Sequence, residues 1–361
     1  VCSSDLLAIF PGIKTAYYVA PCFFASNLIG IFGLFLLRID YSRTVMVSSA
    51  IISILLYIGL FSIARRRTQI TVAVLPFGDL EHLEDIPGIN WRILSSPDDK
   101  LGDIGCVVAD FRADLPDAWE RRLSDYALNG VIVYHVKQLH EGLTGKVRIE
   151  HLSENSFGSL VPLAAYVKVK VIADIIVSLL VLPIVLPMMA IVAILVKLDS
   201  PGPVIFRQQR VGYRGTPFTV YKIRTMTDGH GGLDARRSAM TVENDRRVTG
   251  IGRFLRRMRI DEVPQILNVL KGEMSWIGPR PEACSLAEWY EAELPFYRYR
   301  HVVRPGITGW AQVNQGHVSE VAEVREKLEN DFYYIKFFSP WLDLLIVVRT
   351  ISAVLTGFGS R

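Results

Sequence analysis

Two adjacent acidic residues, Asp261 and Glu262, begin the segment whose residue types are best suited to chemistry. The apolar residues after them have helical spacing, and Pro264 is tolerated only in the first turn of a helix, so the pair is predicted at a helix N-terminus. One interpretation of Asp261 is a helix cap. The other rests on the free backbone N–H groups and positive dipole of such a terminus, which bind phosphate and keep a nucleophilic carboxylate ionised. Spacing alone leaves both open.

Basic residues surround the acidic pair along the chain. Arg256 belongs to an arginine-rich helix predicted over residues 246–259, and Arg280 and Arg304 stand beside prolines and glycines in short turns. Guanidinium groups bind phosphate oxygens two at a time, although arginines in such runs are often solvated or contact anionic lipid. Three glycines in these turns would let the backbone approach a diphosphate: Gly278, Gly306 and Gly309.

Adjacent carboxylates and a diphosphate ligand together predict a hard divalent cation, so magnesium held by Asp261 and Glu262 is the expected cofactor. No Ser-His-Asp arrangement stands out, and His301 and His317 are expected to be structural or surface residues. The four cysteines have neither disulfide nor metal-ligand spacing, which fits a reducing compartment.

Two uncharged stretches near the N-terminus, residues 15–37 and 44–64, have the length of membrane-spanning helices, which need about 20 apolar residues. A buried core helix is the alternative, but two adjacent runs of this length rarely fit inside a soluble domain. Three arginines at positions 65–67 follow the second run directly. The positive-inside rule therefore predicts that the rest of the chain lies in the cytosol.

A third apolar stretch, residues 175–196, is flanked by basic residues at both ends and contains Pro183 and Pro187. Proline inside a helix removes a backbone hydrogen bond and clashes with the preceding turn. Both facts predict a broken helix that enters the cytosolic leaflet and turns back, over residues 170–197. A kinked helix that spans the membrane completely is the alternative.

Residues between these membrane stretches alternate in type. Apolar, β-branched runs at residues 70–77, 106–111 and 131–136 enclose a helical stretch at 116–129, which predicts a small α/β domain with a parallel sheet. The turn after the first run, residues 77–82, has one glycine and lacks the fingerprint of dinucleotide-binding domains. A structural or regulatory role is therefore favoured over ligand binding.

The composition is intermediate between a soluble and a polytopic membrane protein, with 50% hydrophobic residues and a mean hydropathy of +0.28 over 361 residues. The formal charge of +4 permits anionic partners without selecting one. Nucleic acid is not an expected partner, because the arginines of residues 246–259 lack interleaved aromatic residues and a known binding module.

Several ordered motifs resemble the bacterial sugar transferases known as monotopic phosphoglycosyl transferases: residues 199–212, 222–226, 261–275, 278–281 and 304–313. The resemblance extends roughly from residue 166 to the C-terminus. It implies transfer of a sugar 1-phosphate from a UDP-sugar to undecaprenyl phosphate, with release of UMP through a covalent aspartyl phosphosugar. UDP-glucose or UDP-galactose is the expected donor, as in members that initiate exopolysaccharide, capsule or O-antigen repeats, and N-acetylated sugars are the alternative.

The resemblance also implies residue roles. Asp261 matches the nucleophile, and Glu262 matches a residue that binds magnesium or assists proton transfer. Phosphate binding falls to Arg256, Arg280 and Arg304, while Lys222 supports the acidic pair. In many members a Ser-Pro pair breaks the re-entrant helix, and Leu186-Pro187 stands at that place here, so the break relies on Pro187.

The expected architecture is a membrane-associated α/β protein of three parts. Residues 1–67 hold two transmembrane helices, residues 68–163 a Rossmann-like domain, and residues 164–361 a mainly helical catalytic domain with the re-entrant helix. The larger members typically have four N-terminal helices, and the chain begins with Val1, so truncation upstream is expected. The expected location is the cytoplasmic face of the bacterial inner membrane, in contact with its lipids, with a homodimer as a further expectation. The competing hypothesis is a non-catalytic scaffold or regulator that binds anionic lipid.

Overall fold

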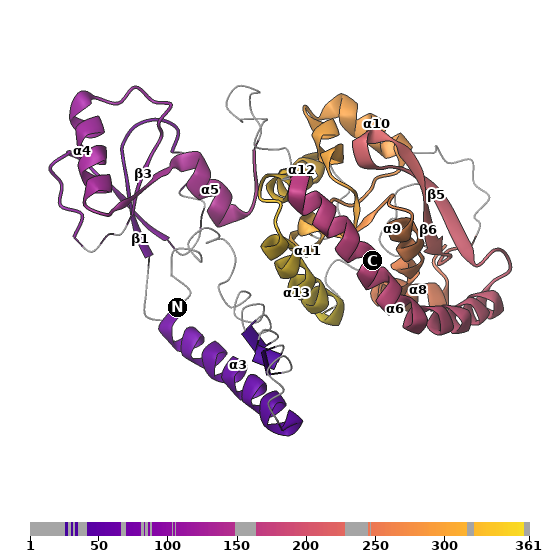
Figure 1. The fold of residues 1–361 in the computed structure, drawn as a ribbon. Helices are drawn as coiled ribbons and strands as arrows, with labels where there is room; N and C mark the ends of the chain where they lie inside the picture. Colours follow the sequence, from indigo (N-terminus) through magenta and orange to yellow (C-terminus); the bar gives the residue numbers. More distant parts are fainter. Residues whose placement is uncertain are drawn as a thin grey trace. The chain divides into compact units, whose positions relative to one another are not determined.

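In a computed structural model, the chain divides into two compact units, Val1–Lys146 and Val147–Arg361 (Figure 1). The described residues are 26–27, 30–31, 33–34, 42–65, 70–80, 83, 86, 89–102, 104, 106–148, 164–227, 245, 247–315 and 321–356. Most of the first predicted membrane helix, residues 15–37, lies outside these ranges. The second, predicted over residues 44–64, is a helix, α3 (Arg43–Arg65), whose side chains at Val45, Ile52 and Leu55 are exposed.

Four parallel strands form the sheet of the first unit in the order β2-β1-β3-β4, which confirms the predicted parallel α/β fold. The strands are β1 (Ile70–Val74), β2 (Ile89–Ile93), β3 (Cys106–Ala109) and β4 (Ile132–His135). The helices are α4 (Asp117–Leu128), where a helix was predicted, and α5 (Val136–Thr144). The sequence did not predict β2, because its Asn-Trp-Arg centre gives it no apolar run.

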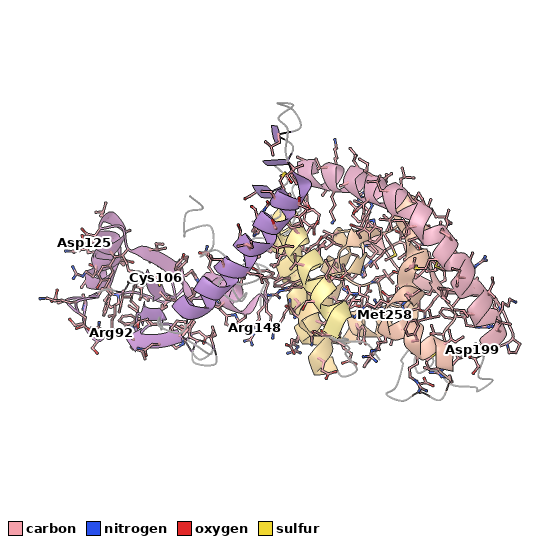
Figure 2. The ribbon with its side chains drawn as sticks, turned by 90° about the horizontal axis from the view of Figure 1, so that it is seen from below. Arg92, Cys106, Asp125, Arg148, Asp199 and Met258 are labelled. Atoms are coloured by element: carbon pink, nitrogen blue, oxygen red, sulfur yellow. The ribbon has the colours of Figure 1, made fainter. Side chains whose placement is uncertain are left out.

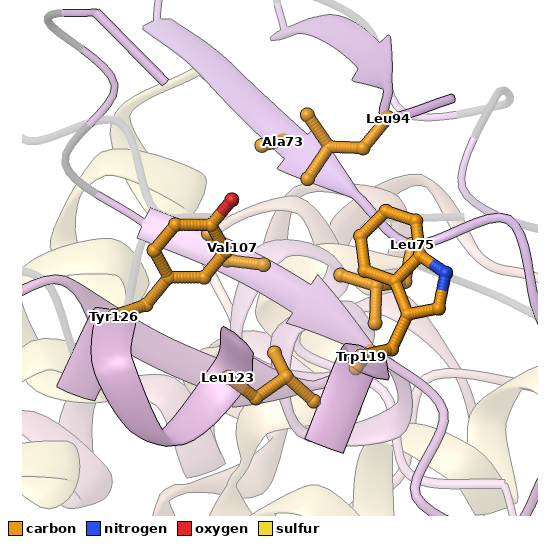
Figure 3. Packing of buried hydrophobic residues seen from close by; sticks show 8 residues of the cluster. Ala73, Leu75, Leu94, Val107, Trp119, Leu123 and Tyr126 are labelled. Atoms are coloured by element: carbon orange, nitrogen blue, oxygen red, sulfur yellow. The ribbon is translucent and has the colours of Figure 1, made fainter. Parts of the chain in front are cut away.

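Helices cover both faces of this sheet. Successive side chains of a strand point to opposite faces, so Ala73 of β1 packs in the cluster that holds Trp119 of α4, whereas Val72 of β1 packs in the cluster that holds Leu139 of α5. Figure 3 shows the first of these two clusters, with Trp119, Leu123 and Tyr126 of α4 lying over the strands. The sheet is thus buried on both sides, as expected for parallel strands.

The second unit begins with α6 (Ala164–Asp199), a helix of 36 residues. Among the described residues it is the one helix long and apolar enough to cross a membrane, judged by length and composition. Only 11% of its most apolar window is buried, which distinguishes it from the core helix of a soluble domain. Figures 1 and 2 show α6 bent between its ends, and Pro183 and Pro187 near its middle account for a bend. The expected break at Leu186-Pro187 is therefore a bend within one continuous helix.

Both arms of α6 pack against the same unit. In the N-terminal arm, the Lys170 ammonium lies 2.5 Å from Asp343 Oδ2, and the Trp276 indole N–H donates to Ser178 Oγ at 2.9 Å. In the C-terminal arm, buried Val192 and Val196 form a cluster with Ile223 and Leu255. Several apolar side chains between the arms are exposed, including Leu180, Ile184 and Leu186.

Short elements build the rest of the unit. An antiparallel hairpin joins β5 (Ile205–Val211) to β6 (Pro217–Ile223) through η2 (Tyr213–Gly215), and a parallel pair joins β7 (Ser275–Ile277) to β8 (Gly306–Thr308). The helices are α8 (Gly250–Arg257), η3 (Ile260–Gln265), α9 (Ile266–Leu270), α10 (Cys284–Glu293), η4 (Tyr297–Val302), α11 (Trp310–Asn314), α12 (Val321–Lys336) and α13 (Pro340–Thr356). Buried side chains of α12 and α13, such as Tyr333, Tyr334 and Leu345, complete the core.

Candidate active site

The β5–β6 hairpin and α8 supply two of the predicted site residues. Lys222 lies near the end of β6, and Arg256 lies on the last turn of α8, where its Nε donates to Thr225 Oγ1 at 2.8 Å. The predicted helix at residues 246–259 is shorter in the structure, because the Thr249 side chain caps α8 and so fixes its start.

Asp261 and Glu262 lie in the first turn of η3, and both are buried. Arg259, in a left-handed conformation with φ of 54°, turns the chain between α8 and η3. The sequence predicted an α-helix N-terminus here, but a 3₁₀ turn comes first and the α-helix after it, α9, has only 5 residues. Arg259 occupies the capping position, so the interpretation of Asp261 as a helix cap does not apply.

The turn that carries Arg280 is fixed by close backbone contact between β7 and β8. Gly306 N–H donates to Pro279 O at 2.9 Å. A Cβ atom on Gly306 would lie 2.1 Å from Gly278 N, and one on Gly309 would lie 2.1 Å from Gly278 O. The glycines therefore allow two segments of this chain to approach each other, and the expectation that they approach a diphosphate stays a prediction.

Glu262 is held by two cations. Its Oε1 accepts a hydrogen bond of 2.6 Å from Arg280 Nη2 and one of 3.2 Å from Lys222 Nζ. Burial alone would raise the pKa of Glu262, but the charges of Arg280 and Lys222 outweigh burial and hold that pKa well below its usual range. Burial lowers the pKa of Lys222 to about 8, although the Glu262 charge opposes this shift.

Asp261 has a different environment from its neighbour. Within the described residues, no hydrogen bond or salt bridge holds its carboxylate, while Lys222, Arg280 and Arg256 lie near enough to act on its charge. Burial, followed by repulsion from ionised Glu262, raises the pKa of Asp261. Glu262 is thus an anion held by hydrogen bonds, whereas Asp261 is a more basic carboxylate that lies near cations without a hydrogen bond in the described structure. A carboxylate in this environment is suited to attack a phosphorus atom.

Comparison with known proteins decides the family. The model of the family described as bacterial sugar transferase matches residues 165–357. The chain belongs to the bacterial sugar transferase family. It is accordingly an enzyme, a transferase, and the resemblance of its motifs to this family is confirmed.

Relatives of this sugar transferase match it over different lengths. A UDP-N-acetylgalactosamine-undecaprenyl-phosphate N-acetylgalactosaminephosphotransferase of Aeromonas hydrophila is 45% identical over 98% of this chain and 83% of its own length. A UDP-glucose:undecaprenyl-phosphate glucose-1-phosphate transferase of Caulobacter vibrioides is 42% identical over 52% of this chain and 70% of its own length. One of the same name from Escherichia coli is 43% identical over 49% of this chain and 38% of its own length.

Arg304, which was predicted to bind phosphate in this sugar transferase, makes no described contact with the residues around Glu262. Arg304 Nε donates to Gly272 O at 2.9 Å, and its guanidinium carbon lies 5.4 Å from the centre of the Tyr213 ring. No contact joins Arg304 to Asp261 or Glu262 in the described part of the chain. Its predicted role in binding phosphate therefore stays a prediction without a geometric argument.

The residues that support Arg280 were not predicted from the sequence. Buried Arg300 donates from Nη2 to the Arg280 carbonyl at 2.8 Å and also pairs with Asp331 at 2.8 Å. Arg210 donates to the carbonyl of the next residue, Pro281. No signal in the sequence separates Arg300, which is 2% exposed, from Arg298 two residues earlier, which is 80% exposed.

Proposed function

We propose that this transferase moves a sugar 1-phosphate from a UDP-sugar to undecaprenyl phosphate, releases UMP, and so starts the assembly of an exopolysaccharide or related glycan. The observation that carries the proposal is the division within the acidic pair. Lys222 and Arg280 hold Glu262, while Asp261 is unbonded among the described residues and has a raised pKa. The undecaprenyl-phosphate substrates in the names of the A. hydrophila and E. coli relatives support the acceptor.

The proposed reaction has two steps. In the first, an Asp261 carboxylate oxygen attacks the sugar-bearing phosphorus of the UDP-sugar, the bond from phosphorus to the bridging oxygen breaks, and UMP leaves with the bonding electrons. In the second, a phosphate oxygen of undecaprenyl phosphate attacks the same phosphorus, and the Asp261 carboxylate leaves. The product is an undecaprenyl diphosphate sugar, and Asp261 is regenerated.

The cations around the pair are proposed to bind the phosphate oxygens, on which negative charge accumulates during each step. Lys222, Arg280 and Arg256 all act on the charge of Asp261, so a phosphoryl group beside that carboxylate would lie within their field. Glu262 has a positioning role in this proposal. Its bonds to Lys222 and Arg280 hold both cations at one place before the substrate arrives.

Magnesium is proposed as the cofactor. Among the described residues, no group of three or more His, Cys, Asp and Glu side chains could hold a metal ion. That absence fits magnesium, which proteins commonly bind through one or two carboxylates together with water and substrate phosphates. Asp261 and Glu262 are the carboxylates that would hold it beside the diphosphate, and the ion would neutralise charge on the phosphate oxygens.

An N-acetylhexosamine is proposed as the sugar, in place of the glucose or galactose expected from the sequence. The relative named for N-acetylgalactosamine matches 98% of this chain, whereas the two named for glucose match about half of it. The longer match includes the first unit as well as the transferase part.

The proposed location is the cytoplasmic face of the inner membrane, with α6 entering the membrane and returning. A straight helix of 36 residues would place its ends roughly 54 Å apart, beyond the thickness of a bilayer. Both arms of α6 instead pack on this one unit, and apolar side chains on the opposite face of the helix are exposed along its length. Since one unit cannot lie on both sides of a membrane, the packing supports a re-entrant helix.

A UMP-release assay across several UDP-sugars, with purified enzyme, magnesium and undecaprenyl phosphate, tests the proposal. UMP release is expected with UDP-N-acetylgalactosamine or a close N-acetylated analogue, together with a lipid-linked sugar diphosphate. Release with UDP-glucose alone would overturn the choice of sugar. Failure to release UMP with any donor would favour the scaffold hypothesis.

A further inference from the structure

A hollow of about 440 Å³ lies where α6 ends and the β5–β6 hairpin begins. Among the described residues, its lining combines apolar and cationic side chains without an acidic one: Pro203, Ile205, Phe206, Arg207 and Arg224. A lining of this kind suits a ligand with an anionic group attached to an apolar body.

Arg224 is the unusual member of the lining, because it is a buried cation without a carboxylate partner in the described structure. It is 6% exposed, and its Nη atoms donate to Ser200 O at 2.6 Å, Ser200 Oγ at 3.0 Å and Pro201 O at 2.7 Å. Its buried Nε–H has no acceptor among the described residues. Burying a charge is costly unless an opposite charge or hydrogen bonds compensate it, and here the described acceptors are neutral oxygens, so the positive charge at the wall of the hollow would attract an anionic group.

The loop after α6 is shaped around this guanidinium. Gly202 has φ of +123°, and a Cβ atom there would lie 1.9 Å from Arg224 Nη1. Any other residue at position 202 would displace the arginine or strain the backbone. The position of the charge at the wall of the hollow is therefore fixed by the fold.

The apolar side of the hollow lies beside the end of the membrane helix. Phe206 is 47% exposed, and Leu198, on the last turn of α6, is 78% exposed. Exposed aromatic and aliphatic side chains next to a membrane-entering helix are placed to contact lipid chains. A ligand could thus reach the hollow from the bilayer.

The hollow also adjoins the candidate active site. Phe206 pairs with Lys222 across the hairpin, and Lys222 donates to Glu262. Arg224 follows Lys222 by two residues, a separation of about 7 Å along an extended chain. A phosphate bound by Arg224 would therefore lie within a short distance of the acidic pair.

We propose that this hollow binds the polyprenyl phosphate acceptor, with Arg224 and Arg207 on its phosphate and with Phe206 and Ile205 against the first part of its chain. The inference rests on the proposed function and adds an acceptor site to it. A nucleotide is a poorer fit, because the described lining residues include no polar side chain besides the two arginines to hydrogen-bond with a uracil ring.

Measuring the two half-reactions separately tests the acceptor site independently of the proposed function. The first is measured as UMP released from the UDP-sugar without acceptor, in a single turnover. The second is measured as formation of the lipid-linked sugar against the concentration of polyprenyl phosphate, in nanodiscs of neutral lipid. Arg224→Gln and Arg207→Gln are compared with Arg214→Gln, which changes an exposed arginine at the other end of the same hairpin.

Both hollow variants are expected to keep the first half-reaction and to raise the KM for polyprenyl phosphate roughly ten- to a hundredfold, as for loss of a charge-assisted hydrogen bond. Arg214→Gln should leave both half-reactions unchanged. An unchanged acceptor KM in the hollow variants, or a raised KM for the UDP-sugar instead, would overturn the acceptor site. Absence of both half-reactions in the unaltered enzyme would overturn the proposed function itself.

Two further outcomes of these experiments have defined interpretations. If Arg224→Gln loses both half-reactions through misfolding, the acceptor KM of Arg207→Gln decides alone, because Arg207 is exposed and its replacement leaves the core intact. If the variants keep their acceptor KM but bind vesicles containing phosphatidylglycerol more weakly than the unaltered enzyme, the hollow binds a phospholipid head group and the inference is wrong.

Discussion

Arg280 Nη2 lies 2.6 Å from Glu262 Oε1, and this contact joins the turn after β7 to the first turn of η3. Each side chain shifts the pKa of the other, since the Glu262 charge raises the pKa of Arg280 and the Arg280 charge lowers the pKa of Glu262. With Glu262 ionised and bonded, a second negative charge at Asp261 is opposed by repulsion as well as burial. Because of this contact, Glu262 is fixed as an anion and Asp261 is the more basic carboxylate of the pair.

Arg280→Gln is expected to lower the rate of UMP release by about a hundredfold, as for loss of one preorganised donor. Without the guanidinium, the pKa of Glu262 rises, so Glu262 becomes protonated and activity is lost at a higher pH as the solution is acidified. The pH profile of UMP release measures this as an upward shift of the acidic limb. Arg298→Gln, at a side chain 80% exposed, should leave the profile unchanged. An unshifted acidic limb in Arg280→Gln would contradict the role of the ion pair.

The pKa of Lys222 predicts the basic limb of the pH profile of UMP release. Its pKa in the folded protein is about 8, below the usual 10.5, because burial disfavours the charged form. The ammonium of Lys222 therefore loses a proton as the pH rises through about 8, and the neutral amine no longer forms an ion pair with Glu262. Activity is expected to fall above that pH. In Lys222→Arg, whose side chain stays charged, any remaining activity should persist to higher pH. A basic limb at the same pH in both proteins would assign the titration to another group.

The support of Arg280 by Arg300 and Asp331 can be tested through stability. Arg300→Met leaves a buried carboxylate unpaired, so the free energy of unfolding should fall by about 3–5 kcal/mol, and Asp331→Leu should have a similar effect. Chemical denaturation measures both. The double variant removes the charged pair together and should be less destabilised than the sum of the two single changes. Additive losses would show that the pair is not energetically coupled.

The bend of α6 predicts where its ends lie. In a protein whose native cysteines are replaced by serine, single cysteines at Lys168 and Lys197, both exposed, should react with a membrane-impermeant thiol reagent from the cytosolic side only. The accessibility of each position is measured in sealed inside-out and right-side-out vesicles. Reaction of the two cysteines from opposite sides would identify α6 as a spanning helix.

The strongly periodic parts of this fold were predictable from the sequence. The parallel sheet, α4 and the helical nature of residues 44–64 followed from apolar runs and their spacing, and β2 was missed because its polar residues leave no such run. Continuity of α6 was not predictable, because two prolines can either interrupt a helix or bend it, and packing of the flanking arms decides between these outcomes.

The site was predictable in its residue types and less so in its geometry. The sequence identified Asp261, Glu262, Lys222 and Arg280, which the fold brings together. It could not place Arg304, whose guanidinium lies on Tyr213, nor separate buried Arg300 from the exposed arginine beside it. Both depend on contacts between segments far apart in the chain. The close backbone contacts of the turn glycines could not be predicted for the same reason, since their partner is another backbone segment.

Covalent attachment of the sugar phosphate to Asp261 is the central claim, and intact-protein mass spectrometry tests it most directly. The enzyme is incubated with magnesium and a UDP-sugar that supports UMP release, in the absence of polyprenyl phosphate, and quenched. The mass should increase by one sugar phosphate, peptide mapping should place it on Asp261, and addition of polyprenyl phosphate should remove it. Asp261→Asn should lose the adduct and at least about four orders of magnitude in turnover, whereas Asp125→Asn, at an exposed residue of α4, should keep both. An adduct that persists in Asp261→Asn, or turnover with UMP release but no adduct at any time, would contradict the account.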